Sequence, residues 1–314
     1  MPYQLLEIND ADELSARYNG SHLRFQATER GAYAFRWELA QIGSFILQQT
    51  TFSLKTLVEG VTSEDVTNLL LSDAPPGKCV FTGVRMDAGD TILYGAGAEH
   101  FSLAKERTSF NLTWPRSVLE NALAANAGID SPDYFHARSR WSIGPSALLA
   151  LRQLCVNTLQ YFKTAKARHS PVETIQLEKS LLQRFTNTLS LENKVIQQEA
   201  TSLEPSSRII LRARSFMEQA GSQPIYLHEL CRATGVSART LQKVFIETLG
   251  ISPMRYLKVR RLHLARRRLM STTSDQINVK QAAREAGFWE DGRFAEDYYR
   301  LFGFLPSKTL RVDA

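Results

Sequence analysis

The chain has 314 residues, a formal net charge of +6 at pH 7 and 43% hydrophobic residues. This length allows two domains of ordinary size, each with its own core. The charge is uneven. From Arg208 onward there are 19 Lys and Arg against 10 Asp and Glu, a net charge of +9, whereas the remainder carries −3. A basic C-terminal part beside a mildly acidic N-terminal part indicates contact with a polyanionic nucleic acid through one end only.

The sequence gives no sign of export or of a membrane segment. Glu7 and Asp10 stand where a signal peptide would have a basic start and an apolar run. No apolar stretch approaches the ~18 residues of a membrane span. Cys79, Cys155 and Cys231 are far apart and odd in number, and none has zinc-ligand spacing. We therefore expect a reduced, cytoplasmic protein with no membrane partner, no metal and no cofactor.

The N-terminal third of the chain, to about Trp114, consists of short apolar runs separated by Gly, Pro, Asp and Ser. Many short strands with regular turn signals predict a sandwich or a barrel. Residues 86–93, followed by Gly97 and His100, are similar to the sheet–turn–sheet segment of cupin-like barrels. That similarity favours a cupin-like β-barrel. The predicted strands are 23–28, 32–39, 44–51, 67–71, 79–84, 91–93, 100–103 and 110–114.

Aromatic side chains inside such a barrel can line a small-molecule cavity, although more often they simply fill it. Cupin enzymes generally hold a metal with two His close in sequence, and this chain has no His-x-His pair. Nucleophile-elbow and phosphate-loop motifs are also missing from the sequence. We therefore do not expect an enzyme. The candidate effector-binding residues are Phe25, Phe35, Trp37, Phe45 and His100.

Helices are predicted after the strands. Residues 115–126 are expected to close the barrel, and residues 145–162 and 171–189 place leucines and phenylalanines three or four positions apart. This last pair either forms a dimerisation hairpin or packs against the barrel within one subunit. The segment 192–207, rich in Lys, Gln, Glu, Thr and Ser, is predicted to be a polar linker.

The last third of the chain contains a repeated pattern. An apolar residue, a second apolar residue, a glycine and a proline recur with an offset of 53 positions. Two copies are too few for a solenoid, so a pair of DNA-reading modules is the better interpretation. The matched positions are Leu241 and Phe294, Phe245 and Tyr298, Gly250 and Gly303, and Pro253 and Pro306.

Each copy has the components of a helix–turn–helix unit. A glycine, Gly235 or Gly287, ends a first helix where the backbone needs positive φ or lacks room for a Cβ atom. Ser237 is placed as the N-cap of the second helix in the first copy. The second helix of such a unit lies in the major groove. Its predicted DNA-binding residues are Ser237, Arg239, Thr240, Gln242 and Lys243 in the first copy, and Arg293 and Glu296 in the second.

A basic helix is predicted between the copies, from Met254 to Met270, with Pro253 as its entry residue. Held rigidly, it would span roughly 25 Å at about 1.5 Å per residue. That length would set two reading helices near successive major grooves, whose centres are about 34 Å apart. Arg260 and Arg267 are the predicted DNA contacts on its basic face, and a merely solvated face is the alternative.

Residues 208–311 resemble the DNA-binding domain of the AraC/XylS transcription regulators. The segment 287–298, followed by Leu301–Gly303 and Pro306, is similar to the signature of the XylS-like and ethanolamine-regulator-like branches. The resemblance implies a seven-helix domain with two helix–turn–helix units, and an N-terminal effector domain with a dimerisation hairpin. Glu290 and Asp291 depart from the pattern, because two acids suit the helix dipole but repel phosphate. The second unit is therefore expected to bind more weakly or to read other bases.

The side-chain types suit base reading. Arg and Lys donate to guanine, Gln pairs with adenine, and Glu accepts from the cytosine amino group. For Arg239 and Lys243 the alternative is a phosphate contact or solvation. For Glu296 it is an ion pair with Arg293 or Arg300 on the same helix.

The sequence thus predicts an α+β chain with three regions. Residues 1–191 form the effector domain (strands within 1–114, helices within 115–191), residues 192–207 the linker, and residues 208–314 the DNA-binding domain. The expected function is a sequence-specific transcription regulator, and an activator is favoured over a repressor. Its expected partners are promoter DNA, RNA polymerase, a small-molecule effector and a second copy of the chain. A repressor controlled by a protein partner and a cupin-type enzyme with a DNA anchor are the alternatives. XylS-like relatives imply an aromatic acid as effector and ethanolamine-type relatives a cofactor, so the resemblance does not choose.

Overall fold

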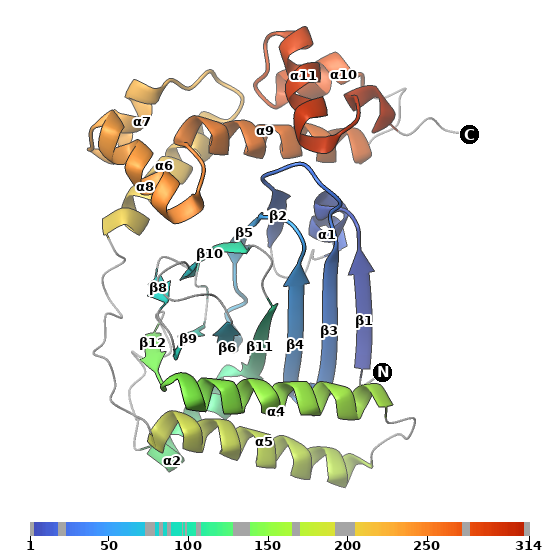
Figure 1. Cartoon of the computed structure of the whole chain (residues 1–314), viewed down its shortest axis with the longest axis vertical. Coiled ribbons are helices and arrows are strands. Elements are labelled where there is room, and N and C mark those ends of the chain that lie inside the picture. The colour runs from blue at the N-terminus through green and yellow to red at the C-terminus, as the bar shows by residue number, and fades with distance from the viewer. Residues whose placement is uncertain are drawn as a thin grey trace.

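The computed structural model has two sheets in its N-terminal part and helices in its C-terminal part (Figure 1). The long helix α9 (Pro253–Met270) runs across one end of the sheets, and helices α4 and α5 lie on the opposite side. The structure describes residues 3–17, 23–72, 79–81, 84–86, 89–95, 97, 99–104, 108–127, 139–164, 170–191, 205–271 and 277–310.

The first sheet has seven strands in the order β1-β3-β4-β11-β6-β9-β12, all paired antiparallel. Its alternating apolar residues give the sheet two different faces, as the period of two along a strand requires. The strands are β1 (Tyr3–Ile8), β3 (Phe35–Ile42), β4 (Phe45–Phe52), β6 (Val66–Ser72), β9 (Asp90–Tyr94), β11 (Thr108–Pro115) and β12 (Ser139–Ser142).

The second sheet has five strands in the order β2-β5-β10-β7-β8. No pairing joins it to the first sheet among the described strands, so the predicted closed barrel is wrong and two facing open sheets take its place. The alternation of apolar residues is the same in a closed barrel and in two facing sheets, so the sequence pattern could not distinguish them. The strands are β2 (Arg24–Ala27), β5 (Thr56–Val61), β7 (Cys79–Phe81), β8 (Val84–Met86) and β10 (Glu99–Ala104).

Side chains of the seven-stranded sheet pack with helices α4 and α5, which lie at the end of the strands opposite α9 (Figure 1). Phe45 stacks on Trp114 with ring centroids 4.6 Å apart, and Phe185 of α5 meets the Trp114 ring edge-on at 5.7 Å. The predicted helix pair therefore packs against the sheet of its own chain. The helices are α2 (Arg116–Ala127), α4 (Pro145–Thr164) and α5 (Pro171–Leu191), and a short helix, α1 (Ala11–Arg17), follows β1.

The C-terminal part consists of short helices on both ends of α9 (Figure 1). Two clusters of buried side chains hold it together, one around Phe245 and Tyr256 and one around Phe294 and Tyr298. The predicted basic helix is confirmed within one residue. The other helices are α6 (Pro205–Ala220), α7 (Leu227–Thr234), α8 (Ala238–Leu249), α10 (Val279–Glu285), α11 (Asp291–Phe302) and the 3-10 turn Pro306–Lys308.

Most of the predicted linker, residues 192–204, lies outside the described residues. Residues 205–207 already belong to α6, which begins at Pro205. Within the described portion of the chain, none of the helices combines the length and the apolar character needed to cross a membrane.

The packing of α5 on the sheet predicts the cost of removing one ring. Phe185 is 1% exposed, so Phe185→Ala should lower the free energy of unfolding by about 3–5 kcal/mol through lost burial and the cavity left behind. Val172, on the same helix but 63% exposed, is the control, and Val172→Ala should change stability by about 0.5 kcal/mol at most. If chemical denaturation shows the same change in the free energy of unfolding for Phe185→Ala and Val172→Ala, α5 does not pack as described.

Candidate nucleic-acid interface and inter-sheet cavity

The first helix pair, α7 and α8, turns at Gly235, whose φ of 73° lies in the left-handed region that favours glycine. The Ser237 hydroxyl accepts a hydrogen bond from the Thr240 backbone N–H at 3.2 Å, so the predicted N-cap is confirmed. Leu241 and Phe245 are fully buried and fix the helix on the core.

The predicted DNA-binding residues of α8 lie on the opposite side of the helix from that core. Their positions alternate with the buried ones at helical spacing, and the Lys243 ammonium lies 3.9 Å from the Glu247 carboxylate. Both ends of this ion pair are more than half exposed, so water competes with it. The exposed residues are Ser237, Arg239, Thr240, Gln242 and Lys243.

The second helix pair, α10 and α11, turns at Gly287. Its φ is 84°, and a Cβ atom there would lie 2.7 Å from the Ser222 carbonyl oxygen, so this position requires glycine. Arg293 and Glu296 of α11 are exposed as predicted. Glu296 pairs with Arg300 at 2.5 Å, one turn along the helix, which is one of the alternatives that the sequence left open.

Helix α9 joins the two helix pairs. One of its faces contacts the N-terminal part, and another lines a groove. Tyr256, His263 and Arg267 follow each other at seven and four positions and therefore share one face, which contacts the N-terminal part. Met254 and Lys258 lie two positions to either side of Tyr256, which places them about 200° around a helix of 3.6 residues per turn. The groove described next is lined from that second face.

The groove lies between α9 and the second helix pair and has a volume of about 510 Å³. It is lined by Met254, Arg255, Lys258 and Arg261 of α9, and on the other side by Trp289 and Arg293 at the start of α11. Asp297 of α11 pairs with Lys258 at 2.8 Å, which ties the second pair to α9. Four basic side chains line the groove together with two acidic ones, Glu290 and Asp297, so its lining has a net positive charge.

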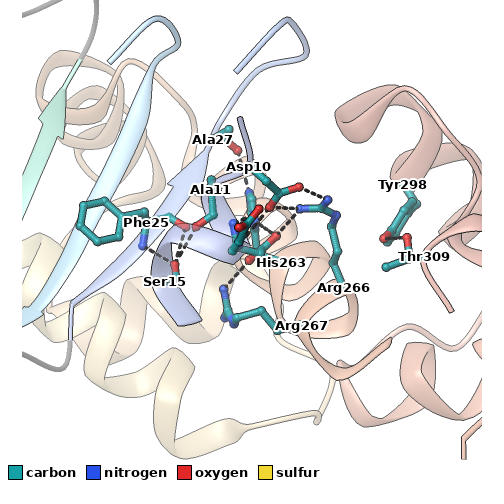
Figure 2. A network of polar contacts seen from close by, with 12 residues as sticks. Asp10, Ala11, Ser15, Phe25, Ala27, His263, Arg266, Arg267, Tyr298 and Thr309 are labelled. Atoms are coloured by element: carbon teal, nitrogen blue, oxygen red, sulfur yellow. Dashed lines mark hydrogen bonds and ion pairs between the residues drawn. The ribbon is translucent and has the colours of Figure 1, made fainter. Parts of the chain in front are cut away.

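The other face of α9 is held by two carboxylates at the start of α1 (Figure 2). Asp12 is fully buried and contacts the His263 ring nitrogen Nδ1 at 2.8 Å, a guanidinium nitrogen of Arg266 at 2.9 Å and one of Arg267 at 2.9 Å. Asp10 pairs with Arg266 and also accepts hydrogen bonds from the backbone N–H groups of residues 12 and 13, so it caps α1. The other ring nitrogen of His263 lies 2.9 Å from the Ala27 carbonyl oxygen of β2.

The charge of Asp12 depends on these neighbours. Burial alone would raise the pKa of the Asp12 carboxyl, but His263, Arg267 and Arg266 together outweigh burial and hold this pKa below its ordinary value. A buried carboxylate is stable only with such partners, because an unpaired charge in a protein interior is costly. The contact between α1 and α9 therefore depends on these polar groups being together. We call Asp10, Asp12, His263, Arg266 and Arg267 the Asp12 cluster.

Arg260 and Arg267, which the sequence predicted as DNA contacts, are both paired with acidic side chains of this chain. Arg267 is turned toward Asp12, and the Arg260 guanidinium pairs with Glu218 of α6 at 2.6 Å with only 15% of its side chain exposed. Neither residue lines the groove between α9 and the second helix pair. Their predicted role in DNA binding would require these pairs to open. Arg255 lies on the groove instead.

A second contact between the two parts is mostly apolar. Leu57 and Phe101 of the five-stranded sheet belong to the same buried cluster as Ile210 and Met217 of α6. Glu59 of β5 adds a polar centre, because it accepts a hydrogen bond from the Tyr256 hydroxyl and pairs with Arg214 at 3.3 Å. Burial, followed by the charge of Glu59, raises the pKa of Tyr256 well above its ordinary value, so this hydroxyl remains a donor.

Two further contacts reach the far ends of the reading helices. The Lys55 ammonium lies 3.4 Å from the carbonyl oxygen of Gly250, which follows α8. The Arg30 guanidinium lies 5.2 Å from the centre of the Tyr299 ring, near the end of α11. The N-terminal part therefore touches the C-terminal ends of α8 and α11, whereas the predicted base-reading residues begin at their N-terminal ends.

A cavity of about 210 Å³ lies between the two sheets. Phe25, Phe35 and His100 line it, as the sequence predicted for a ligand-facing site. Phe45 lies on the other face of its strand against Trp114, and Trp37 is half-buried with its indole nitrogen 3.3 Å from the Gln48 side chain. Neither is among the described lining residues. We call this space the inter-sheet cavity.

The described residues contain no group of three or more His, Cys, Asp and Glu side chains placed to hold a metal ion. His100 instead lies 3.2 Å from the Ser102 hydroxyl and meets the Phe81 ring edge-on at 4.8 Å.

Comparisons with known proteins concern mainly the C-terminal part. The family model described as "Helix-turn-helix domain" matches residues 230–311, which include α8, α9, α10 and α11. The chain is 38% identical over 104 residues to the "Probable thc operon regulatory protein" of Rhodococcus erythropolis, a match that covers 33% of this chain and 31% of that protein. It is 37% identical over 100 residues to the "XylDLEGF operon transcriptional activator 3" of Pseudomonas putida, covering 32% of this chain and 30% of that protein.

A solved structure described as a probable AraC family transcriptional regulator from Rhodopseudomonas palustris is 35% identical, with a TM-score of 0.30. The match covers 32% of this chain and 94% of that one. The chain spans about a third of the length of the curated relatives named above. Through this helix-turn-helix domain, the chain is similar to transcription regulators of the AraC/XylS type.

Proposed function

We propose that the protein is a sequence-specific DNA-binding transcription regulator of the activator type, which acts in the cytoplasm on promoter DNA. One observation carries the proposal: two helix pairs with exposed Arg, Lys and Gln side chains are attached to the two ends of the single helix α9. At about 1.5 Å per residue this helix is roughly 27 Å long, which suits neighbouring major grooves about 34 Å apart. The activator sense is drawn from the name of the Pseudomonas putida relative.

The residue types assign roles on the DNA. Arg239 and Lys243 are proposed to donate to guanine, and Gln242 to pair with adenine. Arg293 is proposed to act in the same way from α11. Glu296 can accept a hydrogen bond from a cytosine amino group only if its ion pair with Arg300 opens. Both side chains are exposed, so breaking this pair costs little free energy.

The groove between α9 and the second helix pair is proposed to face the DNA backbone that separates the two major grooves. Arg255 is the proposed phosphate contact there, because it lines the groove. Ser237 and Thr240, whose hydroxyls lie 2.9 Å apart at the start of α8, are proposed to contact the backbone beside the first reading helix.

Control is proposed to come from the N-terminal part, residues 1–191, which docks on the opposite face of α9. An effector or a partner protein would act by favouring one docking arrangement over another, which requires different affinities for the two arrangements. RNA polymerase and a second copy of the chain are the further proposed partners. The docked part leaves the groove open, so control would act through the positions of the helix pairs rather than by blocking DNA.

Purified full-length protein should bind the DNA upstream of its own gene more tightly than random duplex at moderate salt. Fluorescence anisotropy with labelled duplexes measures both affinities. Equal affinity for the two duplexes would contradict the proposed function.

Arg239→Ala should reduce affinity for the cognate site by about 1–3 kcal/mol and relax base preference at one position, because a base contact is lost. Binding to a set of single-base variants of the site measures this preference. Arg184, an exposed arginine on α5, is the matched control, and Arg184→Ala should leave the profile unchanged. If Arg239→Ala weakens every sequence alike, Arg239 contacts phosphate and not a base.

The two faces of α9 can be distinguished by salt dependence. Arg255→Ala should weaken binding to all sequences and reduce the slope of log affinity against log salt by about one unit, the value of one phosphate contact. Arg267→Ala, at a residue that pairs with Asp12 and does not line the groove, should leave this slope unchanged. The reverse pattern would place the DNA on the face that Asp12 occupies.

Asp12→Asn should destabilise the docking of the two parts, because it removes the negative charge that three basic groups share. Breaking one partner of a buried pair costs about 3–5 kcal/mol, so the full chain should unfold at a lower temperature in calorimetry. Glu13→Gln is the control, since Glu13 pairs with Arg17 at the surface and should change little. An unchanged unfolding profile for Asp12→Asn would contradict the docked arrangement.

The same contact should depend on pH with a definite sign. The folded-state pKa of Asp12 is lowered, so its stabilisation is complete above the ordinary value near 4 and is lost as pH falls through the folded value. Asp10, His263, Arg266 and Arg267 are the charged or titratable groups that face it. The loss of stability below about pH 4 should be smaller in Asp12→Asn than in the wild type.

A further inference from the structure

The ring of His263 is enclosed at the contact between α9 and the N-terminal part (Figure 2). The residue is 1% exposed, so water has almost no access to the ring. Nδ1 lies 2.8 Å from a carboxylate oxygen of Asp12, and Nε2 lies 2.9 Å from the carbonyl oxygen of Ala27. Both ring nitrogens are therefore within hydrogen-bond distance of an oxygen atom of the N-terminal part.

Both of these oxygen atoms act as acceptors. The carbonyl of Ala27 carries no proton. Burial acts to raise the pKa of the Asp12 carboxyl, but His263, Arg267 and Arg266 together hold this pKa below its ordinary value, so the carboxyl is ionised at neutral pH. The ring of His263 thus meets two acceptors and no donor at these contacts.

The charge of the ring follows from the number of donors that it needs. A neutral imidazole has one N–H donor and one acceptor nitrogen, whereas the imidazolium ion has two donors. A neutral His263 would point a lone pair at an oxygen atom 2.8 or 2.9 Å away. The imidazolium form instead donates to Asp12 and to Ala27 at once, so the docked geometry calls for a ring that carries both protons.

The other neighbours of the ring offer no substitute contact. Phe302 of α11 meets it at a nearly perpendicular angle of 88°, with ring centroids 5.1 Å apart, and a phenyl ring has no hydrogen-bonding nitrogen or oxygen. Burial raises the pKa of the Tyr33 and Tyr298 hydroxyls, so these groups stay uncharged near neutral pH. The other described charged groups at this contact are Asp10, Asp12, Arg266 and Arg267.

We infer that docking of the N-terminal part on α9 is coupled to the binding of one proton, which His263 holds. A histidine in water has an ordinary pKa near 6.5. Below about pH 6.5 the ring carries its second proton in either arrangement, and the contact contributes fully. Above that pH docking must take up a proton, so rising pH weakens it. Asp12 acts in the opposite sense at acid pH, which leaves an intermediate pH range in which docking is strongest.

This coupling makes pH an input to the regulator. Histidine is the side chain whose ordinary pKa lies within the physiological range, so a small change of pH alters the occupancy of this proton. If docking sets the positions of the two helix pairs, the affinity for DNA follows. This last step rests on the proposed function, whereas the protonation of His263 does not.

The charge of the ring can be observed directly by NMR in full-length protein with 15N-labelled histidine. The chain has 6 histidines. At pH 7.5 one ring should carry an N–H on both nitrogens, and its signals should be missing in His263→Gln. A spectrum in which no ring is doubly protonated would overturn the inference without any variant, as would signals of such a ring that persist in His263→Gln.

Asp12→Asn tests the same point without removing the ring. An amide can donate to a ring nitrogen as well as accept from it, so a neutral His263 can then satisfy both contacts. The second ring proton should be lost at pH 7.5 in this variant. A ring that stays doubly protonated beside Asn at position 12 would show that the carboxylate of Asp12 does not determine its charge, and would overturn the inference.

The coupling itself is measured by urea denaturation of the full chain between pH 6 and 8. One proton held in the folded state alone raises the equilibrium constant for unfolding by up to about tenfold per pH unit. From pH 7 to 8 this constant should rise at least about threefold more in the wild type than in His263→Gln. His228 is exposed and stacks on Tyr226, so His228→Gln is the matched control and should follow the wild type. Equal pH dependence in the wild type and His263→Gln would overturn the coupling.

DNA binding separates this inference from the proposed function. The ratio of affinities for the upstream duplex at pH 6 and pH 8, at constant salt, should differ at least about threefold between the wild type and His263→Gln. His228→Gln should keep the wild-type ratio. A doubly protonated His263 in a protein that shows no preference for the upstream duplex would contradict the proposed function and leave the proton site standing. Specific binding with the same ratio in the wild type and His263→Gln would contradict the role of pH as an input.

Discussion

Helix α9 is the constraint on which the other parts of the structure depend. Both helix pairs are attached to it, and the N-terminal part docks along it. A helix is stiff over this length, so the spacing of the two pairs is set by the number of residues between Pro253 and Met270. Its two faces have separate tasks, one toward the groove and one toward Asp12. Charge alone does not reveal this division, because arginines occur on both faces.

The Asp12 cluster explains why a basic helix can be buried at all. Arg266 is 8% exposed and lies beside His263, which is 1% exposed, and unpaired guanidinium charges would be strongly unfavourable at such a position. Two carboxylates, Asp10 and Asp12, compensate them, and the Arg266 guanidinium also lies 4.9 Å from the Phe302 ring centre. The mildly acidic N-terminal part and the basic C-terminal part thus complement each other within the chain as well as toward DNA.

The sequence predicted well what local patterns determine. Ser237 as N-cap, the glycine turns and the full extent of α9 depend on neighbouring residues, and the structure confirms them. The strands β1 and β5 and the helix α1 were not predicted. Helix α1 has only seven residues, and β5 contains Glu59 and Gly60, so their local preferences are weak and tertiary contacts determine their structure.

Those unpredicted elements supply several of the contacts between the two parts, Asp12 from α1 and Leu57 and Glu59 from β5. The roles of Arg260 and Arg267 could not be assigned from sequence for the same reason, since their partners lie on α6 and α1. Likewise, the period of two along β4 places Phe45 on one side and Gln48 on the other, but does not say which side faces the cavity. Base-reading positions are local in sequence, whereas the docking surface is not.

A hydroxyl-radical footprint of the full-length protein on its upstream DNA tests the role of α9 most directly. Two rigidly spaced helix pairs should protect two stretches on one face of the duplex, with centres about 10–10.5 base pairs apart. A single protected stretch, or two on opposite faces of the duplex, would contradict the account that α9 holds both reading helices in successive major grooves.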